Sequence, residues 1–385
     1  MPSAPAPSLP ASPRSRLAAL WERHARWLAP LLTLAGIYLL HDRASKLVRT
    51  LAPDAPLSRP LRDLPAHLYQ GWDGIHYFSL AQHFDTFSWP PLYPLALRAL
   101  GSLFSVDALP RAAVLVNLGA HLAIVYLAFA FVRGNPRLQG VPAWLFATLL
   151  LLYPGHNVFF ANYSESLFLA LALGTCVAWQ RGALLVAGVL CGLCLLVRNM
   201  GMYLGAALLL VELARALREW PARPAWGRLL GAAAWVPFFV GWNLWVREVG
   251  GTDIVAATAG WQQELLTVHV PAAMSPKLWV LGYLTLPGHK EFLFFWGAVA
   301  AGAWCWRRAL HVEALFIALF LLSHALYLYR PFPFTRYVSV LFPLALMAAD
   351  LLKRWPPLQA LAVALALTLS TRTQALLFLD RMGEP

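Results

Sequence analysis

Apolar runs of about 14 to 22 residues recur along nearly the whole chain, the length that an α-helix needs to cross a bilayer. Arg, Pro, Gly or a short polar segment separates each run from the next. This pattern predicts an all-α polytopic membrane protein with about 11 transmembrane helices. The predicted spans cover residues 27–41, 111–132, 140–155, 164–180, 182–198, 200–218, 228–247, 291–306, 312–329, 334–352 and 357–372.

The composition strengthens the membrane interpretation. Of the 385 residues, 59% are hydrophobic and only 12% are charged, and this balance excludes a water-soluble globule. The net charge of +12 could suggest a nucleic-acid partner, but the basic residues lie in short connections, so none is expected. All four cysteines fall inside apolar runs, which argues against a disulfide framework or a metal cluster. They are Cys176, Cys191, Cys194 and Cys305.

Basic residues predict the orientation. Residues 1–26 indicate a disordered basic tail before a retained signal anchor, with the tail in the cytoplasm. The alternating spans then put a set of short basic connections on the same side, as the positive-inside rule requires. These connections are RGNPR (133–137), QRG (180–182), REWPARPAWGR (218–228), WRR (306–308) and KRW (353–355).

The outer side receives the long segments. Counting 91–104 as a span would invert every later connection, so we expect a short interfacial helix there, within a first outer loop of 42–110. A second large outer loop covers 248–290. Long loops in compact domains are mostly functional. Residues 27–385 are therefore expected to form one integral-membrane domain with its chemistry on the outer face.

Two acidic residues on the outer side are candidates for that chemistry. Asp73 lies between Trp72 and Gly74 at the start of an amphipathic run, where it could cap a helix or act as a general base. Glu165 lies at the mouth of the 164–180 run. A carboxylate so close to an apolar run is costly unless it is paired or hydrated, which favours a functional role.

Two arginines on the same side are candidates for anion binding. Arg198 ends the 182–198 run, and Arg336 precedes Tyr337 in the last outer connection. Each could be an interfacial side chain that reaches towards water. Together they would make a phosphate site, because a guanidinium matches phosphate oxygens bidentately. Further cations on this side that could extend the site are His289, Lys290 and Arg330.

Motifs for nucleotides and metals are absent: the chain has no Walker sequence, no GxGxxG after a strand, no DxD pair and no HExxH. A catalyst on the outer face also has no access to cytoplasmic nucleotide sugars. An activated sugar would therefore have to arrive as a lipid phosphate.

Five segments carry a family resemblance. They are WDGIHYFSLAQ (72–82), PLYPLALRALG (91–101), FFANYSESLF (159–168), LLVRNMG (195–201) and TRYVSVLFPL (335–344). In order and spacing they resemble the bacterial branch of the GPI mannosyltransferase II, or PIG-V-like, family. That family belongs to the GT-C class of integral-membrane glycosyltransferases.

The resemblance implies a GT-C-like bundle in the bacterial inner membrane, with the active site on the periplasmic face. The reaction it implies is inverting transfer of a hexose, expected to be mannose, from a polyprenyl-phosphate donor to a hydroxyl acceptor, without a metal or cofactor. Asp73 would deprotonate the acceptor, and Glu165 would hold substrate hydroxyls. Arg198 and Arg336 would bind the donor phosphate. The remaining expected substrate-binding residues are Trp72, His76, Tyr163 and Tyr337.

Two other functions fit parts of the pattern. A lipid flippase or secondary transporter would also use many spans and a basic vestibule, and His121 is its best midspan polar candidate, although no internal repeat is evident. A lipid-linked oligosaccharide ligase or polymerase would also act on the outer face. Its diphosphate donor would call for a larger cationic cluster.

Overall fold

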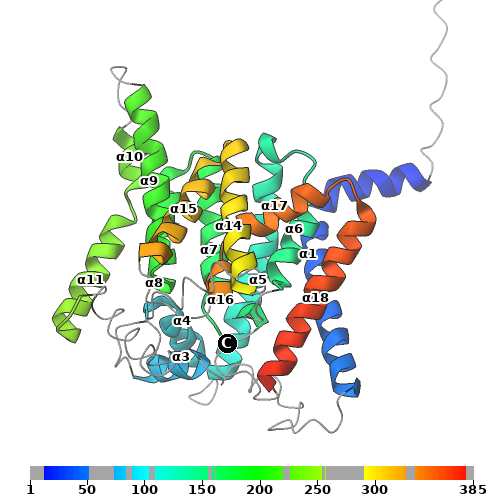
Figure 1. Cartoon of the computed structure of the whole chain (residues 1–385), viewed down its shortest axis with the longest axis horizontal. Coiled ribbons are helices and arrows are strands. Elements are labelled where there is room, and N and C mark those ends of the chain that lie inside the picture. Colours follow the sequence, from blue (N-terminus) through cyan, green and yellow to red (C-terminus); the bar gives the residue numbers. More distant parts are fainter. Residues whose placement is uncertain are drawn as a thin grey trace, which may run out of the picture.

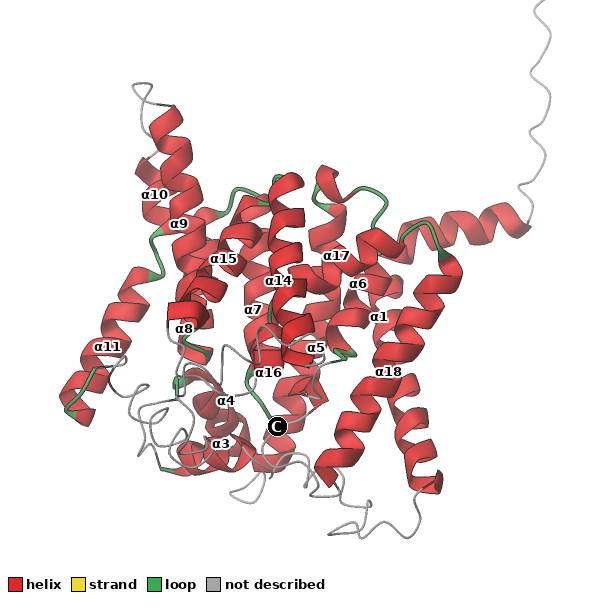
Figure 2. Cartoon of the chain, in the orientation of Figure 1, coloured by secondary structure: helices red, strands yellow, loops and turns green. Residues whose placement is uncertain are grey.

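In the part of the chain that the computed structural model describes, helices joined by loops and turns are the only regular secondary structure, and this part contains no strand (Figure 2). The described residues are 13–51, 73–83, 89–103, 109–154, 158–160, 162–219, 226–253, 256, 290–326 and 334–378. The predicted all-α fold class is therefore confirmed over these ranges.

Each predicted span corresponds to one or two helices (Figure 1). Two spans are interrupted, and in both cases a proline lies in the first turn of the second helix, at Pro237 and at Pro343. The helices are α1 (Pro13–Leu51), α5 (Leu109–Arg133), α6 (Ala143–Leu151), α7 (Glu165–Gln180), α8 (Leu184–Val197), α9 (Gly201–Arg218), α10 (Trp226–Ala232), α11 (Val236–Gly250), α14 (Lys290–Arg307), α15 (His311–Leu326), α16 (Phe334–Val338), α17 (Pro343–Leu352) and α18 (Pro356–Phe378).

The N-terminal segment differs from the prediction. Helix α1 begins at Pro13, so residues 13–26 are helical rather than a disordered tail. Arg, Leu, Ala and Glu dominate this stretch, and these are strong helix formers that continue the helix of the following apolar run. Residues 1–12 of the predicted tail lie outside the described residues.

The segment predicted as the first outer loop, 42–110, carries two short helices, α3 (Asp73–Gln82) and α4 (Leu92–Gly101). With 10 residues, α4 is too short to cross a bilayer, as predicted for the 91–104 segment. It packs against α3, α5 and α8. In Figure 1 both short helices lie together below α8 and beside the lower part of α5.

The helices are apolar on their outer surfaces as well as in the core. Within the described ranges, two helices are long and apolar enough to span a membrane, Leu109–Arg133 and the broken helix Trp226–Gly250, and five others are shorter apolar helices. Large apolar side chains are exposed, including Trp27, Leu32 and Leu361. Surfaces of this kind are unfavourable in water and are well solvated by lipid.

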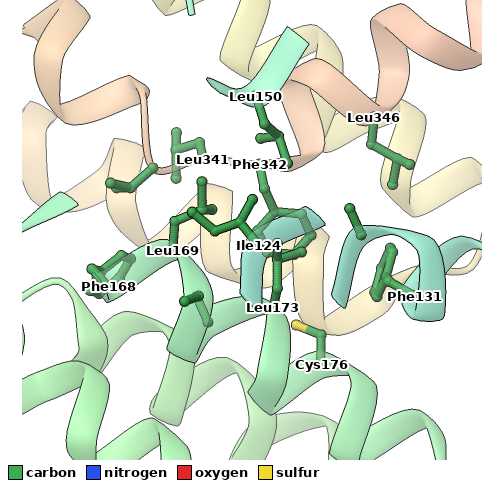
Figure 3. Packing of buried hydrophobic residues seen from close by; sticks show 14 of the residues in the cluster. Ile124, Phe131, Leu150, Phe168, Leu169, Leu173, Cys176, Leu341, Phe342 and Leu346 are labelled. Carbon is green, nitrogen blue, oxygen red and sulfur yellow. The ribbon is translucent and has the colours of Figure 1, made fainter. Parts of the chain in front are cut away.

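A single large core joins the central helices. Ile124 and Phe131 of α5, Leu169 and Leu173 of α7 and Phe342, just before α17, pack together in it (Figure 3). Close packing of this kind holds the helix ends in fixed positions. The first turn of α7 and the last turn of α8 are thereby presented at one end of the bundle.

The basic connections meet at the opposite end. Helix α14 has Glu291, beside Thr335, in its first turn and ends at Arg307. Just beyond it, Arg308 donates from Nη1 to the Arg137 carbonyl at 3.2 Å and pairs with Asp350 at 2.5 Å. Asp350 also pairs with Lys353 at 2.8 Å. Three of the connections predicted to share one side therefore lie close together in space.

Candidate functional site

Helix α7 begins with a buried carboxylate. Glu165 is its first residue, and the side chain is fully buried. The free backbone N–H groups at a helix N-terminus favour a negative charge there. A buried carboxylate is nevertheless costly without a cationic partner.

Two arginines supply that partner. Arg198 Nη1 lies 2.9 Å from Glu165 Oε1, and Arg336 Nε donates to the same oxygen at 2.7 Å. Only 11% of the Arg198 side chain and 8% of the Arg336 side chain are exposed. The three residues come from α7, the end of α8 and α16, so a buried cluster of charges joins three distant parts of the sequence.

Two tyrosines complete the cluster. The Arg336 guanidinium carbon lies 4.3 Å from the centre of the Tyr163 ring, and that of Arg198 lies 5.7 Å from the centre of the Tyr337 ring. Both distances fall within the range of cation–π attraction. Five predicted site residues thus lie together, and we call Tyr163, Glu165, Arg198, Arg336 and Tyr337 the Glu165 cluster.

A tight turn between α8 and α9 positions Arg198. Arg198 is the C-cap of α8 in an extended conformation, and its carbonyl accepts the Gly201 N–H at 2.9 Å. A Cβ atom on Gly201 would lie only 2.2 Å from the Leu195 backbone nitrogen. The turn therefore requires glycine at position 201, and it directs Arg198 towards Ser164, whose Oγ accepts from Arg198 Nη1 at 3.0 Å.

Helix α3 is joined to the same loop. The Tyr77 hydroxyl lies 2.7 Å from Ser164 Oγ, and Asn162 Nδ2 donates to the Gly74 carbonyl at 3.2 Å. The Tyr93 hydroxyl of α4 donates to Asn162 Oδ1 at 2.7 Å. The sequence analysis did not predict these bridging residues, although Tyr77 and Asn162 both lie inside the segments that carry the family resemblance.

These bonds place the backbone at the start of α3 beside the Glu165 cluster. Asp73 is the first residue of α3 and directly precedes Gly74, while the Asp73 side chain and all of Trp72 lie outside the described residues. His76 is exposed and stacks on Trp89 with ring centres 5.6 Å apart. It has no described contact with the Glu165 cluster.

The structure does not describe the side chains of the other predicted cations. His289 and Arg330 lie outside the described residues, and Lys290 is the first residue of α14 with its side chain undescribed. The neighbouring Glu291, which the sequence analysis overlooked, is 3% exposed and bonds to Thr335. No pattern in the sequence singles it out from other acids that begin a helix.

The charge balance of the Glu165 cluster suits an anion. Its two guanidinium cations and one carboxylate leave one net positive charge. Among the described residues, Nη1 is the only guanidinium nitrogen of Arg198 with a hydrogen-bond partner, so its Nε and Nη2 groups remain available. Glu165 Oε2 is likewise buried without a described partner. Within the described residues, the cluster thus offers hydrogen-bond donors of the kind that suit an oxyanion and one oxygen that suits a hydroxyl donor.

The His121 ring is held by side chains of two neighbouring helices. Its Nδ1 lies 2.8 Å from the Tyr38 hydroxyl and its Nε2 lies 3.1 Å from Ser166 Oγ. These contacts tie α1, α5 and α7 together. Both ring nitrogens of the best midspan candidate for a transport pathway are thus engaged between helices.

Comparison with known proteins gives limited matches. No family model matches the chain, and no curated protein matches it. The chain is similar to the crystal structure of ArnT from Cupriavidus metallidurans in the apo state, with a TM-score of 0.47 and 18% sequence identity. The match covers 73% of this chain and 54% of the ArnT chain, so it spans about half the length of that protein.

Proposed function

We propose that this protein is an inverting membrane glycosyltransferase of the GT-C type. It transfers a hexose, expected to be mannose, from a polyprenyl-phosphate donor to a hydroxyl acceptor on the periplasmic face of a bacterial inner membrane. The observation that carries the proposal is the convergence of Arg198 and Arg336 on Glu165 beside the start of α3. The many exposed apolar side chains support the membrane location.

In this proposal the arginines bind the donor phosphate. A sugar phosphodiester carries one negative charge, which matches the one net positive charge of the Glu165 cluster. As the bond between the anomeric carbon and the phosphate oxygen breaks, negative charge grows on the leaving polyprenyl phosphate. Arg198 and Arg336 would stabilise that charge from fixed positions in a largely water-excluded site.

Asp73 is the proposed general base. Its carboxylate would accept the proton of the acceptor hydroxyl as that oxygen attacks the anomeric carbon from the face opposite the phosphate. The new glycosidic bond then forms with inversion, the proton stays on Asp73, and polyprenyl phosphate departs. The bonds from Asn162 and Ser164 to α3 would hold this base in register with the arginines.

Glu165 has a different main role from the one that the family resemblance implies. Its Oε1 is engaged by both arginines, so we propose that Glu165 chiefly orients the two guanidinium groups. Its remaining oxygen, Oε2, is the atom that would accept a substrate hydroxyl.

The test is a transfer assay in proteoliposomes with labelled mannosyl-phosphopolyprenol, a panel of hydroxyl acceptors and a chelator. We expect release of polyprenyl phosphate that survives chelation and is lost in Asp73→Asn. Movement of labelled lipid between leaflets without transfer, at the same rate in Asp73→Asn, would contradict the proposal and favour a flippase.

A further inference from the structure

The helix that carries Arg336 is too short to hold its own position. Helix α16 has five residues, Phe334–Val338. The backbone hydrogen bonds within so short a helix are few, and the N–H groups of its first turn have no partner inside it. The orientation of Arg336 must therefore depend on contacts from other parts of the protein.

Those contacts converge on Thr335, the residue before Arg336. Glu291 Oε2 accepts the Thr335 backbone N–H at 2.7 Å, and Glu291 Oε1 accepts from Thr335 Oγ1 at 3.3 Å. The Tyr153 hydroxyl donates to the Thr335 carbonyl at 2.7 Å. Glu291 and Thr335 are both buried. The N–H and the hydroxyl of Thr335 are thus bonded to α14, and its carbonyl is bonded to Tyr153, just beyond the end of α6.

We propose that Glu291 is a positioning residue for Arg336, acting through Thr335. This inference rests on the proposed function, in which Arg336 binds the donor phosphate. Glu291 lies in the first turn of α14, which packs against α16 (Figure 1). Its carboxylate does for α16 what an N-cap side chain does for an ordinary helix, but from a separate helix.

The contact requires a hydrogen-bond acceptor at position 291. The N–H groups in the first turn of a helix have no partner inside the helix, so an acceptor from a neighbouring element stabilises them. The bond to the Thr335 N–H fixes the backbone one residue from Arg336, whose own Nε lies 2.7 Å from Glu165. A small shift of α16 would separate the guanidinium from both Glu165 and the phosphate, and displacements of about 1 Å can cost about a hundredfold in rate.

Three variants separate positioning from general stability. Glu291→Ala removes both bonds to Thr335, while Glu291→Gln keeps an oxygen that can accept the Thr335 N–H. The matched control is Glu212→Ala, which removes another buried carboxylate. Glu212 pairs with Arg215 and Arg228 near the opposite end of α9 from the Glu165 cluster.

The first measurement is the equilibrium affinity of the purified protein for polyprenyl monophosphate in nanodiscs. We expect Glu291→Ala to weaken it on the order of tenfold to a hundredfold, with Glu291→Gln and Glu212→Ala within about threefold of the wild type. In an Arg336→Ala background, Glu291→Ala should cause no further loss, because the two residues act as a unit. The inference would be overturned if the losses of affinity in Glu291→Ala and Arg336→Ala multiplied in the double variant. It would also be overturned if Glu212→Ala lost as much affinity as Glu291→Ala.

The second measurement does not depend on the proposed function. Amide hydrogen exchange over residues 334–338 should become faster in Glu291→Ala and remain unchanged in Glu212→Ala. Unchanged exchange in Glu291→Ala would overturn the positioning role, whatever the lipid measurement gives. A wild-type protein that binds no lipid phosphate would refute the proposed function, and the exchange data would still decide whether Glu291 holds α16.

Discussion

Arg336 Nε donates to Glu165 Oε1 at 2.7 Å although 171 positions separate the two residues in the sequence. Arg198 reaches the same oxygen from a third element. One buried carboxylate therefore organises two cations that would otherwise repel each other. This arrangement makes the position of each group dependent on the other two.

Glu165→Gln should destabilise the protein strongly. The amide keeps the shape of the side chain but leaves two largely buried arginines without a counter-charge. Removing one partner of a buried charge pair costs about 3 to 5 kcal/mol. The free energy of unfolding in detergent should fall by about this amount, whereas Glu248→Gln, at an exposed position in α11, should leave it unchanged. A variant of Glu165 as stable as the wild type would contradict the burial of this charge.

Arg198→Ala should affect the donor more than the acceptor. Its guanidinium is proposed to contact the phosphate, and losing such a contact costs about 2 to 4 kcal/mol of transition-state stabilisation. Steady-state kinetics with each substrate varied in turn should show the larger fall in kcat/KM for the donor. Arg111→Ala, an exposed arginine in the first turn of α5, is the control. Equal losses for donor and acceptor would count against a phosphate role.

Gly201→Ala should distort the turn that presents Arg198. The new Cβ would meet the Leu195 backbone nitrogen at 2.2 Å, which side-chain rotation cannot relieve. Overpacking of this kind costs about 1 to 3 kcal/mol. The unfolding midpoint should fall and lipid-phosphate affinity should weaken. Gly241→Ala has open space in α11 and should be neutral or slightly stabilising. Identical behaviour of the two variants would show that the turn tolerates a side chain.

Tyr77→Phe should loosen α3 from the Glu165 cluster. It removes the hydroxyl that lies 2.7 Å from Ser164 Oγ in a buried setting, a contact worth about 0.5 to 1.5 kcal/mol. Because α3 carries Asp73, the transfer rate should fall while lipid-phosphate affinity stays close to that of the wild type. Tyr203→Phe is the matched control, since the Tyr203 hydroxyl has no hydrogen-bond partner within the described ranges. An unchanged rate in Tyr77→Phe would argue that this bond does not hold the base.

Much of the fold could be predicted because apolar runs report helices directly. The runs at 111–132 and 164–180 agree closely with α5 and α7. Breaks within helices were harder to predict, because neither Pro237 nor Pro343 interrupts the hydrophobic run in which it lies. The helical start of α1 at Pro13 was missed because the polar composition there masked good helix formers.

The site could be predicted only as a list of residues on one side of the membrane. Polar groups beside apolar runs identified Glu165, Arg198 and Arg336. That Glu165 binds both arginines depends on how α7, α8 and α16 pack, which local patterns do not encode. The bonds of Thr335 to Glu291 and Tyr153 are of the same tertiary kind.

The central claim is that Arg198 and Arg336 bind the phosphate group of a polyprenyl-phosphate lipid. Its most direct test is the equilibrium affinity of the purified protein for polyprenyl monophosphate and for the uncharged polyprenol, in the wild type, Arg198→Ala and Arg336→Ala. We predict that the wild type prefers the monophosphate by at least about tenfold, about 1.4 kcal/mol, and that either substitution removes the preference. Equal binding of phosphate and alcohol by the wild type, or a preference that survives both substitutions, would contradict the claim.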